Sequence, residues 1–169
     1  MSISMHQASA GAFVRGLKVL SHLLEKGAAH AAETGIDPSE LIEARLAPDM
    51  LALAAQVQRV SDTAKLSGER LSGVAAPKME DNETTFPQLQ ARIAKTIAYL
   101  EGLPKAEVDA GEDRTIVMNF GTAKPEFSGP DYLFGFALPN FYFHLVTAHD
   151  ILRHKGVAVG KRDYLGPIA

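Results

Sequence analysis

Four polar residues in this chain could build a chemical site, and they come from two segments that are far apart in the sequence. Asp49 and Gln56 are seven residues apart, and Asn140 and His144 are four residues apart. In a helix each spacing keeps the pair on nearly the same face, because each residue advances about 100° around the axis. A partly buried glutamine amide needs hydrogen-bond partners, and an imidazole can be one of them. We therefore predict a small-ligand pocket lined by Asp49, Gln56, Asn140 and His144.

The stretch around His144 also raises the question of a metal, because it holds three of the six histidines of the chain. A metal-binding pair on a helix needs a spacing of three or four residues. His149 lies about 140° from His144 around the helix axis, and position 148 is an alanine. His144 is therefore the only candidate metal ligand, and no firm metal site is expected. His144 as a half-buried packing residue remains an open interpretation, and His149 and His154 are expected to face solvent.

Composition narrows the class of protein. The chain has 169 residues, of which 46% are hydrophobic and 22% are charged, and its net charge is −3. These values are typical of one globular domain, which we expect to span residues 1–169. Cysteine is absent, which excludes a cysteine nucleophile and a disulfide. Without a basic patch or an apolar run of about 20 residues, we expect a cytoplasmic protein with no nucleic-acid or membrane partner.

Apolar residues that recur at three- and four-residue steps predict four long helices. We expect them over residues 3–34, 48–71, 86–100 and 139–155. Asp49 would then stand in a first helical turn, where the helix dipole alone explains a carboxylate. Asp37 is the predicted N-cap of a short helix over 38–44, and Thr85 forms a predicted capping box with Gln88. Arg92 is expected on a solvated helix face. Four such helices indicate an all-α four-helix bundle.

The segment between the third and fourth long helices has a different pattern. Residues 115–118 are β-branched and apolar, residues 121–125 favour a turn, and residues 126–128 can pair back. This predicts a small β-hairpin or an irregular insertion. Residues 157–169 are expected to form an extended surface arm. The aromatic residues between 134 and 143 indicate core packing or a dimer interface more than a cofactor slot.

Several segments resemble an uncharacterised family, domain of unknown function 1993. They are residues 46–50, 56–58, 62–65, 85–86, 92–96, 136–144, 151–157, 160–161 and 163–166. The resemblance covers nearly the whole chain and implies a DinB/YfiT-like four-helix bundle. For the wider group it implies metal-dependent enzymes, with one histidine on the second helix and a pair spaced by three residues on the fourth. Here the expected second helix has no histidine, and only His144 of the pair is present.

Three functions therefore remain open, and so does the question whether the protein is an enzyme. The first is an uncharacterised DinB-like bundle that binds a small ligand between its helices, without a complete three-histidine metal site. The second is a metal-dependent hydrolase or thiol S-transferase that uses His144 with zinc or nickel. The third is a structural or stress-related interaction module. The family resemblance and the apolar helix faces also lead us to expect a homodimer.

Overall fold

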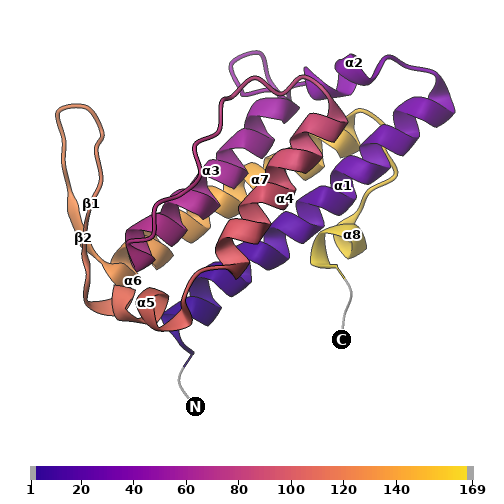
Figure 1. Cartoon of the computed structure of the whole chain (residues 1–169). Coiled ribbons are helices and arrows are strands. Elements are labelled where there is room, and N and C mark those ends of the chain that lie inside the picture. Colours follow the sequence, from indigo (N-terminus) through magenta and orange to yellow (C-terminus); the bar gives the residue numbers. More distant parts are fainter. Residues whose placement is uncertain (1–2, 167–169) are drawn as a thin grey trace.

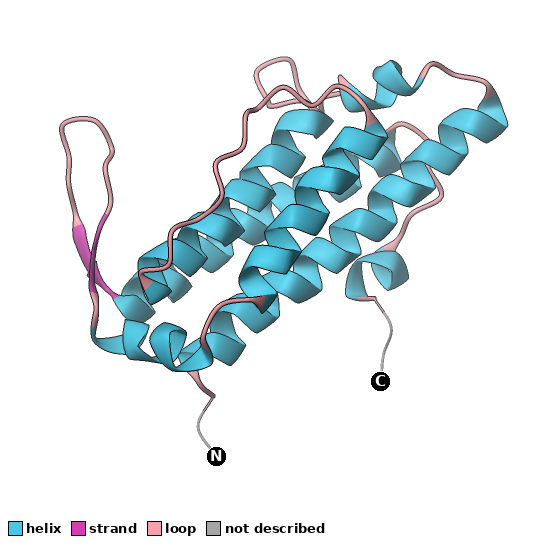
Figure 2. Cartoon of the chain, in the orientation of Figure 1, coloured by secondary structure: helices cyan, strands magenta, loops and turns pink. Residues whose placement is uncertain are grey.

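Four long helices dominate the computed structural model, which describes residues 3–166 (Figure 1). They are α1 (Ala12–Thr34), α3 (Leu53–Ser72), α4 (Phe86–Glu101) and α7 (Leu138–His154). A π-helical turn, η1 (Gln7–Gly11), leads into α1, and the short helix α2 (Pro38–Ile42) follows it. Figure 2 shows helix through most of the chain and one small hairpin. The predicted all-α four-helix bundle is confirmed. No helix within residues 3–166 is both long and apolar enough to cross a membrane.

The long helices form a ring in which α3 packs against α4 and α7, and α1 packs against the same two helices. α3 and α7 run antiparallel, since Thr63 contacts Asn140 and Gln56 contacts His144. The loop over residues 73–85 returns along the length of the bundle before α4 begins (Figure 1). α3 and α4 are therefore parallel neighbours, and this loop is a long crossover connection.

The predicted apolar stripes form the core. Phe13, Leu17 and Leu20 of α1 are fully buried, as are Val57 and Val60 of α3. This burial removes apolar surface from water, which is the main force that holds the helices together.

The packing of α1 against α7 depends on a glycine. A Cβ atom at Gly16 would overlap the ring of Phe141, whose centroid lies 4.9 Å from that of Phe13 in an edge-to-face arrangement. Aromatic pairs favour this arrangement. The absence of a side chain at Gly16 thus allows the two rings to pack between the helices.

Local capping follows the sequence closely. The side chain of Asp37 accepts a hydrogen bond from the Ser39 N–H at 2.9 Å, with Pro38 in the first turn of α2. Thr85 and Gln88 form the predicted capping box at the start of α4. Both helix starts were predicted because a cap needs only neighbouring residues.

The predicted hairpin is also confirmed. The short helix α5 (Lys105–Asp109) and the 3-10 turn η2 (Ala110–Asp113) lead into β1 (Thr115–Val117), which pairs antiparallel with β2 (Glu126–Ser128). α6 (Gly129–Tyr132) and the π-helical turn η3 (Leu133–Ala137) then connect it to α7.

The predicted start of the second long helix is wrong, because α3 begins at Leu53 and not at Pro48. The chain turns back on itself before the helix. Arg45 Nη1 donates to the Met50 carbonyl at 2.6 Å, and the Leu53 N–H donates to the Ala44 carbonyl at 2.9 Å. These bonds hold Asp49 in an exposed turn and not in a first helical turn.

The predicted extended arm is wrong over residues 157–166, and residues 167–169 of that prediction lie outside the described part of the chain. Val157 and Val159 are buried, and helix α8 (Lys161–Leu165) packs against α1. Asp163 accepts a hydrogen bond from the Gly160 N–H at 2.9 Å. That bond caps α8 at its N-terminus and stabilises a short helix in a segment that contains several glycines.

Candidate functional site

Gln56 and His144 meet at the interface of α3 and α7. The Nδ1 atom of His144 lies 2.7 Å from Oε1 of Gln56, and Nε2 of Gln56 donates to the Leu51 carbonyl at 3.1 Å. Because the amide nitrogen is used on Leu51, the amide oxygen faces the histidine as an acceptor. His144 therefore donates from Nδ1. The contact between these two predicted residues is present, and their role in binding a ligand stays a prediction.

The other two predicted residues are placed differently. Asn140 Nδ2 donates to the Thr63 hydroxyl at 2.7 Å, one helical turn of α7 away from His144. Asp49 is exposed in the turn before α3 and makes no hydrogen bond or ion pair with Gln56, Asn140 or His144. The structure thus forms two polar contacts across the α3–α7 interface, and Asp49 belongs to neither.

The surroundings of His144 favour the neutral form of its imidazole. Burial lowers the pKa of His144, and the nearby positive charge of Arg59 lowers it further. Its ring also packs edge-to-face against Phe143, with centroids 5.2 Å apart. A neutral imidazole that donates from Nδ1 keeps Nε2 as an acceptor.

The Arg92 side chain is buried within a cluster of charges and does not lie on a solvated face, so that prediction is wrong. Its side chain is 1% exposed. Nη2 lies 2.7 Å from Asp62 Oδ1 and 3.0 Å from Asp81 Oδ1, and Nη1 lies 3.0 Å from Glu83 Oε1. Burial opposes the ionisation of Glu83, but hydrogen bonds from Arg92 and Gln58 outweigh it and lower the pKa of Glu83.

The inward position of Arg92 has a signal in the sequence. It stands three residues after Leu89 and four before Thr96, both of which are buried, so it lies on the inner stripe of α4. Its partners could not be found from periodicity, because Asp81 and Glu83 belong to the crossover loop. The ion pairs of Arg92 therefore connect the crossover loop to α4 of the bundle.

A groove lies between α1 and α8, and we call it the α1–α8 groove. Its volume is about 770 Å³, within the range of small-molecule sites. Val14 and Val19 of α1 and Leu165 of α8 form its apolar wall, together with Gly11 and Gly166. The groove is absent from the predicted sites, because the segment that closes it is predicted from the sequence to be an extended arm.

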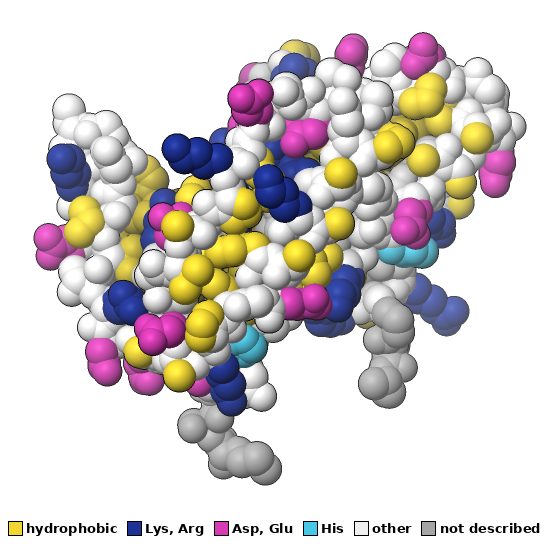
Figure 3. Space-filling view, viewed as in Figure 1, with side chains coloured by type: hydrophobic (Ala, Val, Ile, Leu, Met, Phe, Trp, Pro, Cys, Tyr) yellow, Lys and Arg dark blue, Asp and Glu magenta, His cyan; other side chains and the backbone are white. Residues whose placement is uncertain are grey.

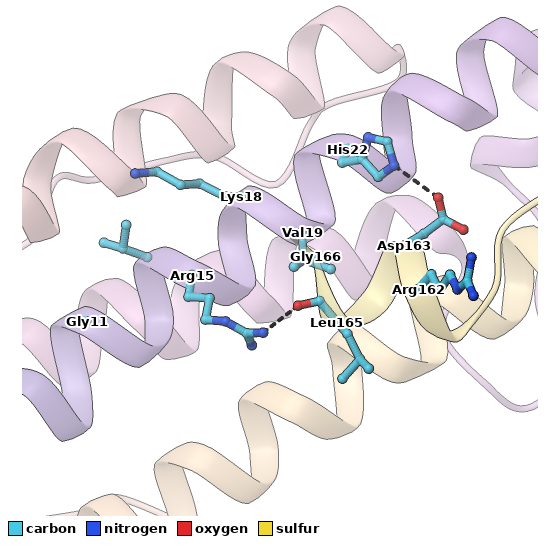
Figure 4. A pocket seen from close by; sticks show the side chains of 10 residues that line it. Gly11, Arg15, Lys18, Val19, His22, Arg162, Asp163, Leu165 and Gly166 are labelled. Atoms are coloured by element: carbon cyan, nitrogen blue, oxygen red, sulfur yellow. Dashed lines mark hydrogen bonds and ion pairs between the residues drawn. The ribbon is translucent and has the colours of Figure 1, made fainter. Parts of the chain in front are cut away.

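Polar contacts hold α8 across the groove, and Figure 4 shows those made by Arg15 and His22. The Arg15 guanidinium donates to the Leu165 carbonyl. Further along, Asp163 Oδ1 lies 3.1 Å from His22 Nε2 and 2.9 Å from Lys26 Nζ. The hydrogen bond from Lys26 and then that from His22 lower the pKa of Asp163 far below its ordinary range. α8 has no fully buried residue, so these contacts and the packing of the partly buried Tyr164 against the core fix its position.

Comparisons with known proteins show the family and the fold of this chain. The sequence profile described as Domain of unknown function (DUF1993) matches residues 5–165. The chain belongs to the DUF1993 family. A solved structure, a DinB family member from Shewanella denitrificans, is 39% identical and superposes with a TM-score of 0.90, over 96% of this chain and 92% of that chain. No curated protein matches the sequence. The expected DinB-like bundle is thus confirmed for this DUF1993 protein.

The histidines of the DUF1993 protein do not gather into a metal centre. Within residues 3–166, no group of three or more His, Cys, Asp or Glu side chains could hold a metal ion. His149 was expected to face solvent, but its side chain is only 15% exposed and its ring packs edge-to-face against Tyr164 of α8. Its Nδ1 bonds Asp150 at 2.8 Å. His154 is exposed, as predicted.

Proposed function

We propose that this DUF1993 protein binds a small ligand with an apolar body in the α1–α8 groove. The observation that supports this function is the groove itself, which combines a ligand-sized volume with a wall of valine and leucine side chains. Binding sites for small molecules are typically concave, mostly apolar and edged by a few polar groups. This groove differs from the predicted pocket of Asp49, Gln56, Asn140 and His144, because none of these residues lines it. The contact between Gln56 and His144 would then serve packing.

A neutral fluorescent probe tests the proposal. N-phenyl-1-naphthylamine becomes bright in apolar sites, and we expect saturable binding with one probe per chain. The variant Gly11→Leu should abolish it, because Gly11 lines the groove. A Cβ atom at this position meets nothing nearer than the His6 carbonyl at 3.8 Å. Leucine also favours a helix over glycine by up to ~1 kcal/mol, so the variant should remain folded.

The control for this variant is Gly135→Leu. Gly135 is an exposed glycine in η3, and nothing lies within 4 Å of a Cβ built there. Gly135→Leu therefore adds the same side chain to a helical turn that does not line the groove. The proposal fails if both variants bind the probe as the parent does.

We also propose that the protein forms a homodimer through the exposed face of α7. Phe143 is 58% exposed and Val146, about one helical turn further on, is 39% exposed. Neighbouring exposed apolar side chains of this kind are typical of association surfaces. Sedimentation velocity on the parent and on Phe143→Ser tests this, with Phe134→Ser as the control. A dimer that only Phe143→Ser dissociates supports the proposal, and a monomeric parent refutes it.

A further inference from the structure

We infer that the ligand of the α1–α8 groove is a monocarboxylate, a molecule with an apolar chain and one negative head group. This inference rests on the proposed ligand binding at the groove and names the class of its ligand. It depends on the charges around the groove, on their existing partners and on the apolar wall between them.

The groove is positively charged although the whole chain is negative. Arg15, Lys18 and Arg162 line it, and Asp163 is the acidic residue among the lining side chains. The net charge of the chain is −3, so the excess of positive charge in the groove is opposite in sign to the charge of the whole chain. Dark blue Lys and Arg side chains flank the region of α8 in the space-filling view (Figure 3). A site of this sign attracts an anion and repels a cation.

The acidic residue in the groove is already neutralised. Lys26 and His22 of α1 both bond Asp163. Its negative charge is therefore already balanced by partners on α1. Lys18 pairs with Glu101 at 3.1 Å, and both side chains are more than half exposed. The Arg162 side chain makes no ion pair with any other residue of the described range 3–166, and Arg15 donates to a neutral carbonyl. Two guanidinium groups therefore remain to receive a carboxylate.

The apolar wall of the groove favours a ligand whose remaining part is a hydrocarbon chain. Val19 is 7% exposed and lies close to Gly166, where a Cβ would stand 3.6 Å from its Cγ2 atom. Figure 4 shows Val19 and Gly166 between the Arg15 contact and the Asp163 contact. A hydrocarbon chain can cover this wall while its head group reaches a guanidinium, which binds carboxylates in a forked geometry.

Displacement of N-phenyl-1-naphthylamine by octanoate, octanol and octylamine at pH 7 tests the inference. The three molecules share one hydrocarbon chain and differ in the charge of the head group. We expect octanoate to displace the probe at about one tenth of the concentration that octanol needs, the factor typical of a hydrogen bond to a charged group. Octylamine should be weaker than octanol. Added salt should weaken octanoate and leave octanol unchanged.

Variants assign the effect to the guanidinium groups. Arg162→Gln should remove most of the advantage of octanoate over octanol while the neutral probe still binds. Arg15→Lys keeps the charge, and Arg15→Gln removes both the charge and the bond to Leu165. If Arg15→Gln alone loses the neutral probe, α8 has moved, and Arg162→Gln then decides the result. Lys124→Gln, an exposed residue between β1 and β2, is the matched control and should behave as the parent does.

The outcomes separate the two proposals. Equal displacement by octanoate and octanol, or an advantage of octanoate that survives Arg162→Gln, overturns the inference about the head group and leaves ligand binding in place. Failure of octanoate to displace a probe whose binding depends on Gly11 also overturns it. A probe that binds Gly11→Leu as well as the parent overturns the proposed function itself.

Discussion

The Nδ1 atom of His144 lies 2.7 Å from Oε1 of Gln56, and this bond links α7 to α3 across 88 residues of sequence. Gln56 is 1% exposed, so the pair lies at the inner edge of the bundle and not on an open surface. In the described structure the bond connects the two helices and orients the imidazole.

Replacing Gln56 tests how much this bond stabilises the fold. Gln56→Leu keeps a side chain of similar volume but leaves the His144 N–H without its acceptor. An unsatisfied buried donor costs about 1–3 kcal/mol, and we expect a loss of that size in the free energy of unfolding by urea denaturation. The exposed Gln7→Leu is the control. An unchanged free energy of unfolding for Gln56→Leu would mean that the bond contributes nothing.

The pH dependence of stability should carry the signature of His144. Its pKa is lowered in the folded protein by burial and by Arg59, from an ordinary value of 6.5. As the pH falls below that value, the unfolded chain takes up the proton first, so the free energy of unfolding decreases. His144→Gln should flatten this decrease. Urea denaturation at several pH values measures it, and parallel profiles for parent and variant would contradict the prediction.

Gly16→Ala should destabilise the bundle although alanine favours a helix. The new Cβ overlaps the Phe141 ring, and overpacking of a core costs about 1–3 kcal/mol. We expect a lower melting temperature by calorimetry. Phe141→Leu in the same chain should restore part of the loss by making room, and Gly11→Ala, with open space around its Cβ, should not destabilise. A parent-like melting temperature for Gly16→Ala would contradict the overlap.

Arg92→Met should release the crossover loop. The substitution leaves Glu83, whose side chain is 11% exposed, without its ion pair, while Asp62 and Asp81 keep their ion pairs with Arg59. Removal of one partner from a buried ion pair costs about 3–5 kcal/mol. Hydrogen exchange should show lost protection at the start of α4. The control is Lys95→Met, an exposed residue about one turn further along the helix. Equal effects of the two variants would rule out a special role for Arg92.

Asp163→Asn should loosen the contact of α8 with α1, because the amide cannot bind Lys26 and His22 as a carboxylate does. Hydrogen exchange should then be faster in residues 161–166, with the core unchanged. The folded protein lowers the pKa of Asp163 from an ordinary value of 3.8. The contact therefore stabilises the protein above that pH and weakens as the pH falls below it. Unchanged exchange in Asp163→Asn would show that α8 is held in another way.

The residues predicted from the sequence differ in how far the structure supports them. The caps at Asp37 and Thr85 were predicted correctly because they need only neighbours in the chain. The meeting of Gln56 and His144 was predicted from helix faces, and the structure contains it. The start of α3 was predicted wrongly, because the bond from Leu53 to Ala44 depends on how the chain folds back.

Hydrophobic periodicity by itself determined the four helices, the buried stripes and the bundle, since these follow from which side chains avoid water. Only the tertiary structure decided which carboxylates bind Arg92, that Asp49 stands apart from His144, and that α8 closes a groove on α1. The physical reason is the same in each case. Charged groups are held by partners from distant segments, such as Asp163 with Lys26 over 137 positions, and a local pattern does not contain the partner.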